Sequence, residues 1–154
     1  MSKEIRKNKW ATCNWICALL MIVLLVMQFT PFWYYGEAGE SCSISGYVWF
    51  PSDQKDLESW LGTQADGHDL NSFVGMPILV LVLSAVGAAL CLIKPDKGMT
   101  TLLPALCGAA GTWAYLTTPA LKLGAGWAWH LLICIALLAL GIYSLMQWAK
   151  EMKN

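Results

Sequence analysis

Charged side chains are missing from four long stretches of this 154-residue chain. Each stretch is at least as long as the roughly 20 apolar residues that a helix needs to cross about 30 Å of hydrocarbon. A water-soluble domain would interrupt such runs every few residues with solvent-facing charge. The stretches without Asp, Glu, Lys or Arg are Trp10–Gly36, Phe73–Ile93, Met99–Leu121 and Leu123–Ala149.

These absences predict an all-α membrane protein that forms one domain over residues 1–154. We expect a bundle of four transmembrane helices, with a small extracellular segment of strand and helix between the first two spans. The expected spans cover about residues 11–33, 73–93, 100–120 and 125–148, and the extracellular segment covers residues 37–71.

The residues that several reactions require are missing as well. The sequence has no nucleophile–base pair, glycine-rich phosphate loop or catalytic His–Glu pair. The spans hold no carboxylate, which argues against small proton-coupled multidrug exporters, because these need a group that exchanges a proton for a cation. Cys42 stands alone in the extracellular segment, which argues against quinone-linked thiol oxidoreductases with paired cysteines. We therefore expect a non-enzymatic protein with no catalytic residues and no cofactor.

The cysteines do not form a disulfide framework, because only Cys42 of the six lies outside the expected spans and their inner ends. The extracellular segment also has no N-x-S/T acceptor for glycosylation. Both absences favour a bacterial plasma membrane. Cys13 and Cys17 lie one helical turn apart near the inner surface, where they are either packed thiols or, in a eukaryote, a palmitoylation site.

Basic residues are concentrated on one side of the expected bundle. The extracellular segment carries seven acidic residues against Lys55, a net charge near −6, and Lys122 is the other outer lysine. By the positive-inside rule, both termini are cytoplasmic. The eight basic residues on the cytoplasmic side are Lys3, Arg6, Lys7, Lys9, Lys94, Lys97, Lys150 and Lys153.

The extracellular segment has its own local signals. Ser41–Phe50 contains β-branched and aromatic residues, which predict a strand or a short hairpin that ends at Pro51. A short helix should follow, with Ser52 or Asp53 as its N-cap and Gly62 at its end. The spacing of three apolar residues gives this helix one apolar face, made of Leu57, Trp60 and Leu61.

Small residues mark the faces where helices approach closely in lipid. The second and third spans have such faces around Gly87 and Gly108, whereas the fourth is rich in Leu and Ile. We therefore expect the fourth span to face lipid or a partner. His130, one turn inside this span, is either a contact residue or an interfacial His bonded to the backbone or to the Lys122 loop.

The partner- or ligand-contact candidates are the large aromatic residues near the outer surface, together with His130. Aromatic rings at such positions stack on sugars or fill a partner's groove. About half of those in the extracellular segment could equally form its own small core. The candidates are Trp33, Tyr35, Tyr47, Trp49, Phe50, Trp60, Trp127, Trp129 and His130.

Neither a metal ion nor a nucleic acid is expected as a partner. Asp66, His68 and Asp69 could hold a divalent cation, but adjacent ligands on a short polar loop are more often solvated, so we expect no metal site. Four basic residues before the first span are ordinary for topology, so we expect no nucleic acid partner.

The order of elements resembles that of claudins, which share four spans and a first outer loop containing strands and tryptophans. The claudin signature has two tryptophans followed by two cysteines in that loop, whereas here Trp33 and Trp49 flank the single Cys42. The resemblance is therefore one of architecture only.

A second resemblance covers about half of the chain. The stretches PFWYYG, SISGYVWFPSD and DLESWL look like small four-span proteins of Gram-positive gut bacteria that are associated with sugar ABC-transporter permeases. This resemblance implies an accessory subunit that docks to a permease in the lipid bilayer. The alternative is a self-associating small transporter or channel, which would need polar residues along the spans.

Overall fold

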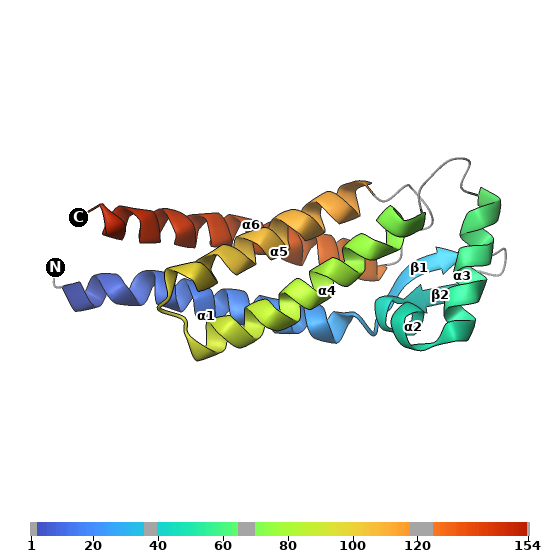
Figure 1. Ribbon diagram of the computed structural model, residues 1–154, viewed down its shortest axis with the longest axis horizontal. Coiled ribbons are helices and arrows are strands. Elements are labelled where there is room, and N and C mark those ends of the chain that lie inside the picture. Colours follow the sequence, from blue (N-terminus) through green and yellow to red (C-terminus); the bar gives the residue numbers. More distant parts are fainter. Residues whose placement is uncertain (1–2, 36–39, 65–69, 118–124, 154) are drawn as a thin grey trace.

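The computed structural model describes residues 3–35, 40–64, 70–117 and 125–153, and four long helices dominate it (Figure 1). Between the first two of them lie two short strands and two shorter helices. In chain order the elements are α1 (Lys3–Met27), β1 (Pro31–Tyr35), β2 (Glu40–Ser43), α2 (Ile44–Trp49), α3 (Pro51–Gln64), α4 (Leu70–Ile93), α5 (Gly98–Thr117) and α6 (Ala125–Met152).

The four long helices lie side by side; each packs extensively against two neighbours, and α1 also contacts α5. α1 packs against α4 and α6, and α5 packs against the same two helices from the other side. Both termini and the α4–α5 turn lie at one end of the molecule (Figure 1). β1, β2, α2 and α3 lie at the opposite end, and we call these four elements the cap.

Three helices are long and apolar enough to cross a membrane, over Trp10–Met27, Gly75–Ile93 and Ala128–Met152. α5 is not among them, because its glycines, threonines and proline lower its hydropathy. Large apolar side chains are exposed along all four helices. Such exposure is expected where lipid rather than water is the solvent. The structure is therefore consistent with an all-α membrane protein.

The first predicted span is too long at its cap end, because α1 ends at Met27 and Pro31–Tyr35 forms a strand. Pro31 has no N–H and disfavours helical geometry at Thr30, which favours an end of the helix before it. Side chains cover the last helical carbonyls: Gln28 donates to the Leu25 carbonyl and Thr30 to the Met27 carbonyl, both at 2.6 Å.

The predicted strand over residues 41–50 is only partly correct. The strand β2 covers Glu40–Ser43 and pairs antiparallel with β1, and the next residues form the helix α2 instead. α3 begins earlier than predicted: Pro51 takes the first helical position, where its missing N–H costs nothing, and the Phe50 carbonyl accepts from the Gln54 N–H at 3.1 Å. The helix also continues past Gly62 to Gln64.

The fourth predicted span is also packed within the bundle, because α5 and α6 form the most extensive helix pair. A Cβ on Gly108 would collide with the Leu138 backbone and lie 2.7 Å from the Cys134 carbonyl oxygen. On the other helix, a Cβ on Gly141 would lie 2.5 Å from the Ala105 nitrogen. The two backbones are therefore in direct contact at the predicted small residues of α5 and at Gly141 of α6.

Buried polar groups join the elements at the end of the molecule that carries both termini, which we call the terminal end. The Asn14 carboxamide donates to the Pro95 carbonyl at 2.7 Å and accepts from the Ser144 hydroxyl at 3.1 Å. The Trp10 indole donates to a Glu151 carboxylate oxygen at 2.7 Å. These bonds connect α1, α6 and the α4–α5 turn. Near them, Cys13 and Cys17 are both buried, as packed thiols should be.

Candidate functional site

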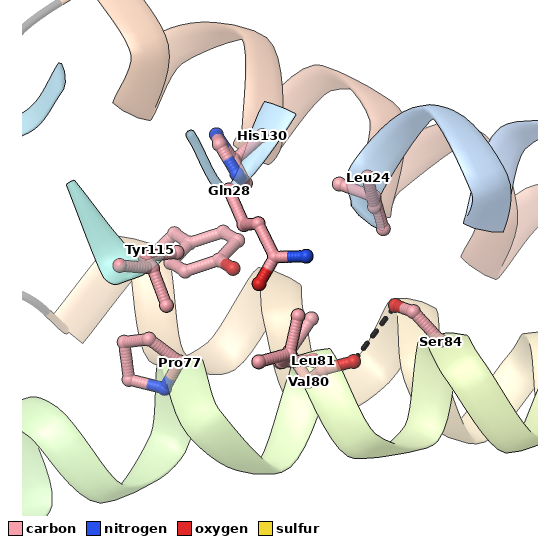
Figure 2. Close-up of a pocket in the computed structure, with 9 residues that line it drawn as sticks. Leu24, Gln28, Pro77, Val80, Leu81, Ser84, Tyr115 and His130 are labelled. Carbon is pink, nitrogen blue, oxygen red and sulfur yellow. Dashed lines mark hydrogen bonds between the residues drawn. The ribbon is translucent and has the colours of Figure 1, made fainter. Parts of the chain in front are cut away.

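A small pocket lies where the cap meets the helices, and four polar side chains line it: Gln28, Ser84, Tyr115 and His130 (Figure 2). Gln28 comes from the turn after α1, Tyr115 from the last turns of α5, and His130 from the first turns of α6. Tyr115 and His130 are almost fully buried, at 1% and 2% exposure. Their positions follow from the antiparallel pairing of α5 and α6, which brings the end of one helix beside the start of the next.

The two rings meet edge to face. The centroids of Tyr115 and His130 are 5.8 Å apart and their planes are inclined at 82°. This geometry places the positive edge of one ring against the negative face of the other, an arrangement that aromatic pairs prefer. It also fixes the rotation of α5 against α6 at the cap end.

α4 supplies the opposite wall of the pocket. Pro77, Val80 and Ser84 lie along one face of α4 (Figure 2). The Ser84 hydroxyl donates to the Val80 carbonyl at 2.7 Å and lies 3.3 Å from the Cys107 thiol of α5. Its hydrogen bonds are therefore made within the protein.

The cap contributes a further wall of the pocket. Ile44, the first residue of α2, lines the pocket and is 3% exposed, and Cys42 of β2 is 1% exposed. Both belong to the same apolar core as Leu24 of α1 and Val80 of α4. The cap therefore shares an apolar core with α1 and α4 at this end of the molecule.

The chemistry of this site is limited. The void has room of the order of one water molecule, and the surfaces that face it are apolar. Among the described residues, no three His, Cys, Asp or Glu side chains group as metal ligands. The predicted patch of Asp66, His68 and Asp69 lies outside the described residues. What the pocket region offers is a fixed joint between the cap and the helices.

The predicted contact residues fall into three groups. Trp49, Phe50 and Trp129 are exposed, at 70%, 58% and 58%. His130 is buried against Tyr115, so it is not available to a partner in this structure. The remaining side chains lie outside what the structure describes, although their backbones place Trp33 and Tyr35 in β1, Tyr47 in α2, Trp60 in α3 and Trp127 in α6.

Sequence reasoning did not bring Gln28, Tyr115 and His130 together. Each residue alone is typical of the end of a span, and their meeting depends on the rotation of α5 and α6 and on where α1 stops. The one available signal was that Tyr115 and His130 each lie a few residues from the α5–α6 connection, which places them at a similar depth.

The three long apolar helices are those of a helical protein suited to a membrane. Comparisons with protein-family models, with curated proteins and with solved structures found no match to this chain.

Proposed function

We propose that this chain is a four-span protein of the plasma membrane that serves as a non-enzymatic accessory subunit of a larger transporter. Three helices have the length and composition of spans. α5 is proposed as the fourth span, because it packs between α4 and α6 and its outward side is apolar. The exposed residues of that side include Leu102, Leu106, Trp113 and Leu116.

The proposed orientation puts the terminal end in the cytoplasm and the cap outside. The positive-inside rule supports this choice, because four lysines are exposed at the terminal end. They are Lys94, Lys97, Lys150 and Lys153. The acidic residues Glu40 and Asp56 are exposed on the cap.

The filled interior is the observation that carries the accessory role. Met21 of α1, Tyr115 of α5 and Leu137 of α6 are fully buried among the helices, with Val80 of α4 beside them. The buried polar groups of Asn14 and Ser84 bond to their neighbours instead of lining an open route. A single chain with this interior is better suited to act through its surface than to conduct a solute.

The proposed docking surface is the outward side of α6. It presents Trp129 near the cap end, and aromatic side chains of this size are common anchors of protein interfaces. The resemblance to proteins associated with sugar ABC transporters makes a permease the proposed partner. The large exposed apolar residues on this side of α6 are Trp129, Leu132, Ile135, Ile142 and Met146.

Co-expression with the permease subunits of a sugar ABC transporter from the same organism tests this role. We expect the chain to co-purify with the permease in mild detergent at a fixed ratio. In the same experiment, the chain reconstituted alone in liposomes should give no sugar or ion flux above that of empty vesicles. Reproducible flux from the isolated protein would instead support the self-associating transporter or channel.

A further inference from the structure

The corner between α2 and α3 exposes two consecutive aromatic side chains. Trp49 and Phe50 are 70% and 58% exposed, although the segment that carries them starts in the core at Ile44. Two large neighbouring rings that face outward need an apolar or interfacial environment. We propose that this corner inserts into the outer headgroup region of the bilayer and anchors the cap on the lipid surface.

The depth of the corner follows from the length of α2. Ile44 packs in one core with Leu24 and Val80, which both lie within stretches suited to cross the membrane. Trp49 lies five positions after Ile44, so at 1.5 Å per residue the helix axis carries Trp49 about 8 Å from that depth at most. The interfacial region on each side of a bilayer is about 5 to 7 Å thick. Because α2 lies at the cap end of the helices (Figure 1), Trp49 lies near the lipid headgroups.

Other exposed aromatic residues occur at the same end of the helices. Phe29 follows α1, Trp113 lies near the end of α5, and Trp129 lies near the start of α6, and all three are more than half exposed. Tryptophans concentrate at this depth in membrane proteins because their rings are amphipathic. Trp49 and Phe50 continue this aromatic belt on the cap.

The chain becomes water-facing directly after the corner. Ser52, Lys55 and Asp56 are exposed on the first turns of α3. Charged side chains are costly in hydrocarbon and are stable in water. The change from exposed rings to exposed charges within six residues marks where α3 leaves the lipid surface. In this proposal Trp49 and Phe50 contact lipid, and no permease partner is required.

Site-directed spin labelling of the protein alone tests the anchor. Single Trp49→Cys, Phe50→Cys and Asp56→Cys variants are labelled with a nitroxide and reconstituted in phosphatidylcholine–phosphatidylglycerol vesicles. Wild-type protein, whose six cysteines are all buried, sets the labelling background. Accessibility is then measured to oxygen, which enters the bilayer, and to a water-soluble nickel chelate.

We expect the labels at positions 49 and 50 to be about threefold or more less accessible to nickel than the label at 56, since the polar chelate is excluded from lipid. Equal nickel accessibility at 50 and 56 would overturn the anchor. Low accessibility of 49 and 50 to both reagents would overturn it too, because it would mean that protein covers the corner. As a check without cysteine substitution, brominated lipid should quench wild-type fluorescence more than that of Trp49→Phe.

Discussion

Asn14 of α1 donates a hydrogen bond of 2.7 Å to the carbonyl of Pro95 in the α4–α5 turn, across 81 residues of sequence. The same carboxamide accepts from Ser144 of α6 at 3.1 Å. One buried side chain therefore joins three parts of the chain at the terminal end. Since water does not reach this position, the lost bonds of a variant would not be replaced by solvent.

Asn14→Leu should lower the free energy of unfolding by about 1 to 2 kcal/mol, because the partly buried Pro95 carbonyl and the buried Ser144 hydroxyl both lose a partner. Thermal unfolding in detergent micelles measures the effect. Tyr143→Phe is the control: Tyr143 is half exposed on α6, next to Ser144, and loss of its hydroxyl should change stability little. Equal losses from both variants would contradict the assigned role of Asn14.

The α5–α6 contact predicts a sharp difference between two adjacent residues. Gly108→Leu should prevent the native packing of α5 on α6, because even a Cβ collides with the Leu138 backbone. Ala109→Leu adds a larger side chain at the next position, which is exposed, and should leave the unfolding temperature nearly unchanged. Size-exclusion elution and thermal unfolding distinguish the two outcomes. A well-folded Gly108→Leu protein would show that the helices are further apart than described.

The third prediction concerns Ile44, which packs the cap into the core of the long helices. Ile44→Ala should destabilise the protein by about 2 to 4 kcal/mol, in the range of large-to-small core substitutions. The loss should appear first as faster proteolysis within the cap, because the long helices keep their other contacts. Ser41→Ala, at an exposed position on β2, is the control and should be cut at the wild-type rate. Unchanged proteolysis of Ile44→Ala would mean that other residues hold the cap.

The long apolar helices could be predicted because a charge in lipid costs several kcal/mol, so its absence over 20 residues is informative. The small residues around Gly108 also indicated close helix contact correctly. The end of α1 could not be predicted, because Phe32–Tyr35 suits both the edge of a span and a strand. The helix α2 was missed because local preference in Ile44–Trp49 favours a strand, and packing of Ile44 in one core with Leu24 and Val80 outweighs it.

The proposed four-span topology predicts which positions a membrane-impermeant thiol reagent labels in intact cells. Lys55→Cys, on α3, should be labelled from outside, and Lys97→Cys, in the α4–α5 turn, only after permeabilisation. Both lysines are exposed, so the difference reports sidedness and not burial. The wild-type cysteines are buried and give the background. External labelling at position 97 would show that α4 does not cross the membrane as proposed.

The last prediction separates the docking surface from the other lipid-facing surfaces. Trp129 on α6 and Trp113 on α5 are the same residue type, lie near the same end and are 58% and 67% exposed. If α6 docks to a permease, Trp129→Ala should reduce co-purification by about tenfold or more, as expected for loss of an interface anchor worth about 2 kcal/mol.

Trp113→Ala should leave co-purification unchanged, because Trp113 lies on α5, outside the proposed docking surface. Neither variant should alter the unfolding temperature of the isolated chain by more than a few degrees, since both side chains point away from the core. Equal loss of co-purification from the two variants would mean that both rings act through the lipid interface, and the α6 docking surface would then be wrong.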